Sequence, residues 1–88
     1  MVNNNMYYVV GRQSCPYCVK AKDLLHEKSL NYKFRDLEEN RELLMEFARK
    51  FSWDTVPMVF KFDEDGSPTF LGGYTDLVDH LNQSKNAR

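Results

Sequence analysis

The sequence predicts an α/β fold in which three helices flank a four-stranded mixed β-sheet, in the order β-α-β-α-β-β-α. Three observations lead to this prediction. Short runs of β-branched and aromatic residues alternate with longer segments whose apolar residues recur at helical spacing. A turn-rich stretch then separates two further apolar runs, which is typical of a β-hairpin. A last short amphipathic segment precedes a polar end.

Length and composition are those of one small domain over residues 1–88, with frayed ends at 1–5 and 84–88. The chain is 42% hydrophobic and 28% charged, within the ordinary globular range. A formal net charge of −1 with mixed signs offers no electrostatic footprint for nucleic acid or anionic lipid. The first apolar run is too short for a signal peptide or a membrane span. We therefore expect a cytoplasmic protein, and a monomer because no long unpaired apolar surface is evident in the sequence.

The first three elements form a βαβ unit. Residues 6–10 are β-branched and aromatic and predict a buried strand that Gly11 ends. Residues 16–28 repeat apolar residues on one helical face, and Pro16 suits the first helical turn. Residues 31–37 alternate apolar and polar side chains, as a half-exposed strand does. Two strands joined by a helix in this way are expected to be parallel.

The second half adds a helix, a hairpin and a last helix. Residues 39–51 have helical periodicity with acidic residues early and basic residues late, which suits the helix dipole. Residues 56–62 and 69–71 flank a turn-rich stretch and predict a hairpin. We expect Thr75 or Asp76 to cap the last helix, which ends in a polar tail that should fray.

The two cysteines carry the chemistry that the sequence suggests. Cys15 and Cys18 lie where the first helix begins after the first strand, which is the context of a thioredoxin-like redox motif. With Cys15 at the N-cap, the free N–H groups of the first turn and the helix dipole favour its thiolate, so we expect it to be the nucleophile. Cys18 lies one turn deeper on the apolar side and is expected to stay protonated and to act as the resolving thiol.

Other interpretations of these residues remain open. If the two cysteines were half of a zinc site, the site would need two more ligands. The candidates, His26 and His80, lie on separate predicted helices without paired spacing, so we expect no metal. Two buried structural cysteines are plausible for isolated thiols and less so at a proline-containing helix start. Arg12, close before Cys15, either adds a positive charge near the thiolate, or holds a ligand carboxylate, or is a solvated loop residue.

Three segments together resemble the signatures of dithiol glutaredoxins. They are residues 15–18 (Cys-Pro-Tyr-Cys), residues 55–57 (Thr-Val-Pro) and residues 72–76 (Gly-Gly-Tyr-Thr-Asp), and their spacing matches over nearly the whole chain. The resemblance implies a thioredoxin-like fold with a cis Pro57 facing the active site. It also implies a glutathione-dependent thiol–disulfide oxidoreductase that reduces protein disulfides and glutathione mixed disulfides. Glutathione is the reductant, and no bound cofactor is expected.

The resemblance also implies how glutathione binds. The backbone at Val56 would pair with the cysteinyl part of the ligand, and the N–H groups opening the last helix would hold the γ-glutamyl carboxylate. The chain departs from the family pattern at Asp54, where many members carry a basic residue. The residues expected to bind glutathione are Arg12, Tyr17, Thr55, Val56, Pro57, Gly73, Tyr74, Thr75 and Asp76.

The resemblance also implies partners, and rival functions remain open beside it. The expected clients are disulfide-bonded or glutathionylated proteins, and ribonucleotide reductase is a customary client of the family. One rival is a redoxin reduced by a thioredoxin reductase. Another is an iron–sulfur cluster carrier that uses Cys15 and external glutathione across a dimer. A third is a non-catalytic binding module in which the cysteines are incidental.

Overall fold

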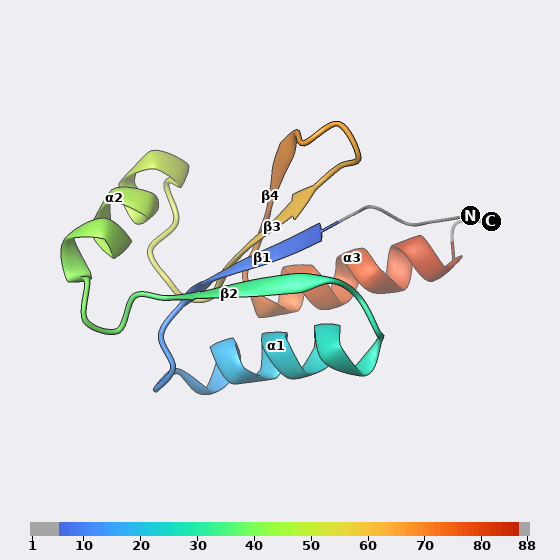
Figure 1. The fold of residues 1–88 in the computed structure, drawn as a ribbon, viewed down its shortest axis with the longest axis horizontal. Coiled ribbons are helices and arrows are strands. Elements are labelled where there is room, and N and C mark those ends of the chain that lie inside the picture. The colour runs from blue at the N-terminus through green and yellow to red at the C-terminus, as the bar shows by residue number, and fades with distance from the viewer. Residues whose placement is uncertain (1–5, 87–88) are drawn as a thin grey trace.

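The computed structural model describes residues 6–86 (Figure 1). The elements follow the predicted order, and the predicted fold class is confirmed. None of the helices in the described part of the chain is long and apolar enough to cross a membrane. The elements are β1 (Met6–Gly11), α1 (Pro16–Glu27), β2 (Tyr32–Asp36), α2 (Arg41–Phe51), β3 (Met58–Phe62), β4 (Pro68–Gly72) and α3 (Tyr74–Asn86).

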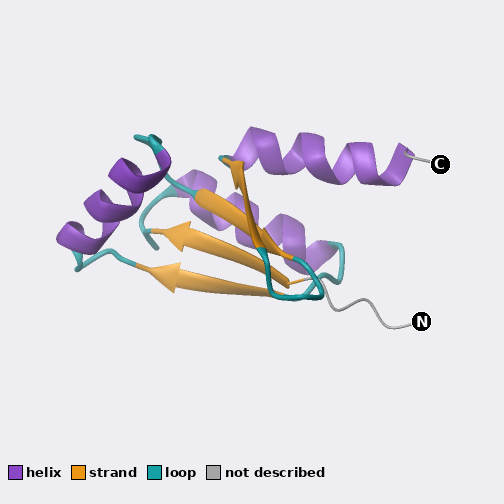
Figure 2. Cartoon of the chain, turned by 90° about the horizontal axis from the view of Figure 1, so that it is seen from above, coloured by secondary structure: helices purple, strands orange, loops and turns teal. Residues whose placement is uncertain are grey.

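The four strands form one mixed sheet in the order β2-β1-β3-β4. β1 is central and pairs in parallel with β2, whereas the β1–β3 and β3–β4 pairs are antiparallel. Parallel neighbours need a crossover, and α1 provides it. The helices α1 and α3 lie on the same side of the sheet, and α2 lies apart from them beyond the ends of β1 and β2 (Figures 1 and 2).

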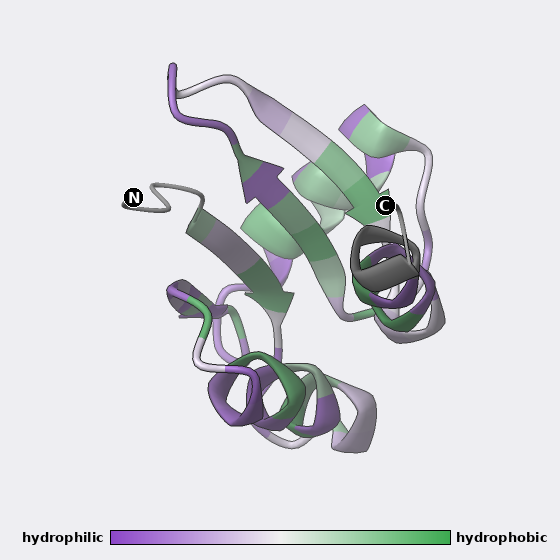
Figure 3. Ribbon diagram, turned by 90° about the vertical axis from the view of Figure 1, so that its right-hand side faces the viewer, coloured by the Kyte–Doolittle hydropathy of each residue, from purple (hydrophilic) through white to green (hydrophobic). Residues whose placement is uncertain are grey.

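Alternation along β1 and β3 gives the sheet a core on each face. Val9 and Val59 point toward α1 and α3, where they pack with Leu25 and Leu77 and have no exposed surface. The adjacent residues, Val10 after Val9 and Met58 before Val59, face the other way, toward the aromatic residues of α2. Much of each strand is therefore hydrophobic, between more hydrophilic segments (Figure 3). Each fully buried aliphatic side chain contributes about 1.5–3 kcal/mol to the free energy of folding.

Several element boundaries differ from the sequence prediction. The predicted strand stopped before Gly11, whereas in the structure Gly11 is the last residue of β1. It is buried and pairs with Asp36 at the end of β2. α2 begins two residues later than predicted because the Asn40 side chain caps it by accepting from the Leu43 N–H at 3.2 Å. Pro68 belongs to β4, an edge strand, where a missing N–H is tolerated. α3 continues to Asn86, into the tail predicted to fray.

Candidate active site

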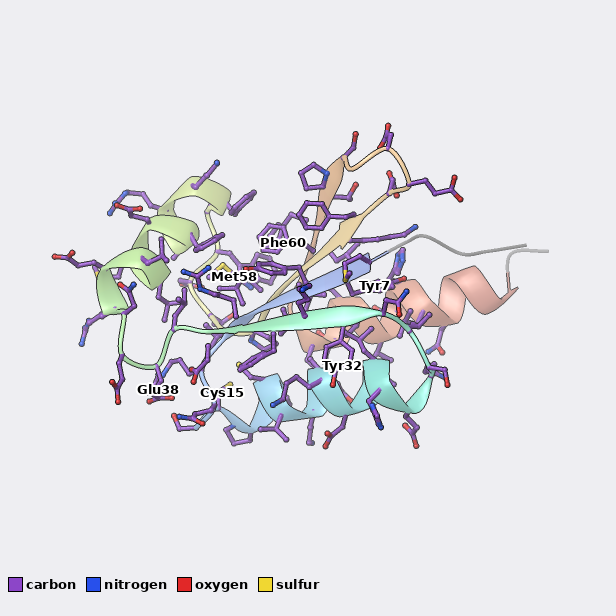
Figure 4. The ribbon with its side chains drawn as sticks, viewed as in Figure 1. Tyr7, Cys15, Tyr32, Glu38, Met58 and Phe60 are labelled. Atoms are coloured by element: carbon purple, nitrogen blue, oxygen red, sulfur yellow. The ribbon has the colours of Figure 1, made fainter. Side chains whose placement is uncertain are left out.

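Cys15 is the N-cap of α1, directly after the loop that leaves β1 (Figure 4). Its backbone is extended, with φ −90° and ψ 118°, and Pro16 begins the helix as predicted. The Cys15 Sγ atom accepts a hydrogen bond from the Cys18 N–H at 3.3 Å, and the residue is half-buried. An N-cap position directs free backbone N–H groups and the positive end of the helix dipole at this sulfur. Cys15 is thus placed as a nucleophile would be.

Cys18 lies one turn into α1 and has no exposed surface. Burial raises the pKa of its thiol to about 12, a hydrogen bond with the Cys15 side chain acts in the same direction, and the nearby Arg12 opposes both. The thiol is therefore protonated at neutral pH. Its space depends on Gly11, because a Cβ atom added there would clash with the Cys18 sulfur.

Residues 55–57 lie against the nucleophile from another part of the chain. The Cys15 Sγ atom and the Val56 carbonyl oxygen are 3.8 Å apart, a distance at which a thiol donates weakly to a carbonyl. The Val56–Pro57 peptide bond is cis, as the resemblance implies. Pro57 is buried, Val56 is half-buried and Thr55 is exposed. The backbone at Val56 is therefore the part of this segment next to the sulfur.

The start of α3 completes the arrangement. The Gly73 N–H donates to Asp76 Oδ2 at 2.9 Å, and the Gly73 carbonyl accepts from the Leu77 N–H at 3.0 Å. Gly73 is thus the residue that caps α3, and the prediction of Thr75 or Asp76 as the cap is wrong. Asp76 sits in the first turn, from which an acidic side chain reaches back to the cap N–H. Gly72 adopts φ +120°, and a Cβ there would clash with the Asp76 carboxylate.

Three contacts bring the predicted segments together. Residues 15–18 meet residues 55–57 through the Cys15–Val56 contact. Residues 55–57 meet the start of α3 at Gly73, where an added Cβ would lie 3.7 Å from the Pro57 carbonyl oxygen. The start of α3 meets α1 through the rings of Tyr74 and Tyr17, whose centroids are 5.9 Å apart. The structure therefore gathers the three segments that are separate in the sequence.

Comparison with known proteins decides the family. The glutaredoxin family model matches residues 5–65. Glutaredoxin 1 of Escherichia coli K12 is 32% identical over 87 residues, which cover 90% of this chain and 95% of the relative. The chain belongs to the glutaredoxin family. The mitochondrial glutaredoxin-2 of Bos taurus is 33% identical over 78 residues, and the chain spans 46% of the length of that relative.

Solved glutaredoxin structures share the fold. A wheat glutaredoxin superposes with a TM-score of 0.74 at 25% identity, covering 92% of this chain and 75% of the wheat chain. A buckwheat glutaredoxin–glutathione complex gives a TM-score of 0.75 at 22% identity, covering 94% of this chain and 74% of that one. The thioredoxin-like architecture of glutaredoxins is therefore the architecture of this chain.

Arg12 lies at a cleft beside the glutaredoxin motifs. The cleft has a volume of about 560 Å³ and runs between α2 and residues 53–56. Arg12 is exposed and forms an ion pair with Glu38, with 3.5 Å between Nη2 and Oε2. Arg41, at the start of α2, is a second cation in the lining, and Asp54 is a second acid. Two cations and two acids thus line the cleft.

Three residues of this region were missed by the sequence analysis. Glu38 contacts residues more than 20 positions away, and Arg41 reaches the cleft from α2, so neither carries a local signal. The Trp53 ring packs edge-on against Phe70 with centroids 5.3 Å apart, and its buried Nε1 has no hydrogen-bond partner among the described residues. Within residues 6–86, no group of three or more His, Cys, Asp or Glu residues is placed to hold a metal ion.

Proposed function

We propose that this chain is a thiol–disulfide oxidoreductase that takes electrons from glutathione and works through Cys15 and Cys18. The observation that carries the proposal is the contrast between the two thiols. One is half-buried at a helix N-cap, and the other is fully buried with a pKa raised to about 12. Such a contrast favours attack by the outer sulfur and resolution by the inner one. Membership of the glutaredoxin family supports the same chemistry.

In the proposed dithiol route, the Cys15 thiolate attacks one sulfur of a substrate disulfide. A mixed disulfide forms, and the other substrate sulfur leaves as a thiolate that takes up a proton. Cys18 then gives up its proton and attacks the Cys15 sulfur, which releases the second substrate thiol and leaves a Cys15–Cys18 disulfide. Two glutathione molecules reduce this disulfide in turn and leave as glutathione disulfide. The cycle uses only thiols, disulfides and protons.

In the proposed monothiol route, Cys15 acts alone. Its thiolate attacks the glutathione sulfur of a glutathionylated protein, and the protein thiolate leaves and takes up a proton. A second glutathione molecule, as its thiolate, then attacks that glutathione sulfur, which frees the Cys15 thiolate and releases glutathione disulfide. Cys18 takes no part, because the attacking thiol comes from solution. The two routes therefore differ in their need for the buried thiol.

The same three segments form the proposed glutathione site. The N–H groups of residues 74–76 lie in the first turn of α3 and offer donors for the γ-glutamyl carboxylate. A peptide-like ligand that pairs with the Val56 backbone would place its sulfur beside Cys15. Arg12 and Arg41 are the cations near enough to the cleft for the glycine carboxylate. The buckwheat neighbour, solved as a glutathione complex, supports this choice of ligand.

Disulfide-bonded and glutathionylated proteins are the proposed clients, with the chain acting as a monomer in the cytoplasm. The test is turnover of a small glutathione mixed disulfide, coupled to glutathione reductase and NADPH. We expect Cys15→Ser to abolish turnover and Cys18→Ser to retain it, while Cys18→Ser loses activity on a protein disulfide. Turnover without Cys15, or protein-disulfide reduction without Cys18, contradicts the assignment. Reduction by thioredoxin reductase but not by glutathione would favour the rival redoxin.

A further inference from the structure

Two carboxylates at the end of β2 hold the loop that carries the nucleophile. Glu38 Oε1 accepts from the Ser14 N–H at 3.1 Å and from the Ser14 hydroxyl at 2.8 Å, and Glu38 Oε2 accepts from Arg12 Nη2 at 3.5 Å. Asp36 Oδ1 accepts from the Gln13 N–H at 3.3 Å and from the Glu38 N–H at 2.9 Å. Every residue between β1 and the nucleophile is therefore bound by one of these two carboxylates.

Glu38 reaches the nucleophile through a short path. The Cys15 N–H donates to the Arg12 carbonyl at 3.1 Å, so residues 12–15 form a closed turn. Glu38 binds both the first residue of that turn, through its guanidinium, and the third, Ser14. The labelled Glu38 and Cys15 lie at the same end of the molecule, where β1 and β2 end (Figure 4). Glu38 is thus linked to the nucleophile through this turn, without direct contact.

The ion pair between Arg12 and Glu38 also offsets the positive charge of Arg12. The Arg12 side chain is 46% exposed and that of Glu38 is 26% exposed, so Glu38 is the more enclosed partner. Hydrogen bonds from Ser14 lower the pKa of the Glu38 carboxyl, and the Arg12 charge acts in the same direction. Glu38 is therefore ionised at neutral pH. Arg12, the cation nearest to Cys15 in sequence, is bound to a carboxylate of its own chain.

We propose that Glu38 is a positioning residue that holds Arg12 and Ser14 in place and weakens the attraction of Cys15 for negatively charged disulfides. The ion pair competes with any ligand carboxylate for the Arg12 guanidinium. The chain thereby favours anionic disulfides over neutral or cationic ones less than it would with a free arginine. The proposal rests on Cys15 being the reactive thiol of the proposed function, and it does not depend on glutathione.

The test compares two alkylating reagents of similar size and different charge. In a Cys18→Ser background, the Cys15 thiolate displaces iodide from anionic iodoacetate or from neutral iodoacetamide. The readout is the ratio of the two rates, which cancels changes in the amount or intrinsic reactivity of the thiolate. Glu38→Gln keeps an acceptor for Ser14 and removes the charge. We expect it to raise the iodoacetate-to-iodoacetamide ratio about two- to fivefold at low salt, and the rise to shrink as salt is added.

Two controls separate positioning of Arg12 from a general loss of negative charge. Glu39→Gln removes the same charge at the next, exposed position, and we expect a smaller rise. In an Arg12→Gln background, the effect of Glu38→Gln should fall to that of Glu39→Gln. An unchanged ratio in Glu38→Gln, or an effect that does not depend on Arg12, overturns the proposal. A failure of the proposed function gives a different result: glutathione turnover is absent, while Glu38→Gln still raises the iodoacetate-to-iodoacetamide ratio.

Discussion

Replacing Gly11 by alanine tests whether the end of β1 leaves the space that Cys18 needs. A Cβ at this position would approach the Cys18 sulfur to under 3.0 Å, whereas ordinary contact begins at 3.4 Å. The sulfur therefore has to move by about half an ångström or more. It is fully buried, so it meets other packed atoms when it moves. Such overpacking destabilises a fold by about 1–3 kcal/mol.

The same displacement should separate the two catalytic routes. A misplacement of about 1 Å in a reacting group can slow a positioned reaction about a hundredfold. We therefore expect Gly11→Ala to slow formation of the Cys15–Cys18 disulfide by about ten- to a hundredfold while glutathione removal by Cys15 stays close to wild type. Rapid-mixing kinetics with a protein disulfide measure the first step, and the coupled glutathione assay measures the second. Urea unfolding of the reduced protein gives the stability.

Gly66→Ala is the matched control for this substitution. Gly66 has φ +86° in the hairpin turn, and an added Cβ there meets no atom within 4 Å. We expect only the backbone cost of roughly 1–2 kcal/mol that a left-handed alanine carries, with both redox routes unchanged. If Gly11→Ala closes the disulfide at the wild-type rate with wild-type stability, the argument that Gly11 makes room for Cys18 is refuted.

Two further predictions concern α3. Asp76→Ala removes the acceptor of the Gly73 N–H and should lower the free energy of unfolding by about 0.5–2 kcal/mol, which urea titration measures; an unchanged midpoint contradicts the cap. Burial, with the Lys61 charge, lowers the pKa of His80, so the folded state binds fewer protons than the unfolded state. Stability should therefore fall as the pH drops through about 6.5, the unfolded histidine value. His80→Gln should flatten the dependence of the free energy of unfolding on pH. A variant with the same slope as the wild type contradicts the role given to His80.

Short-range signals predicted the elements and the nucleophile. Pro16, the position of Cys15 before a periodic apolar face, and the dipole-matched charges of residues 41–51 all act within one or two helical turns. The predicted starts of α2 and α3 were wrong where a capping side chain decided which of several neighbouring residues begins the helix. Asn40 caps α2 and Asp76 reaches back to Gly73, and in each case a single hydrogen bond decided the register.

The sequence by itself determined the order of the elements and the placement of both thiols on one helix turn, because these depend on local periodicity and on residues a few positions apart. It also indicated the family, through three short motifs at 15–18, 55–57 and 72–76 that can be recognised before the chain folds. Only the tertiary structure decided what surrounds the sulfur. Val56 lies 41 positions from Cys15, and Glu38 lies 24 from Ser14. Such contacts exist because β1 pairs with β2 on one side and β3 on the other, which brings their loops to one end of the sheet. That pairing sets the burial and charge at the site.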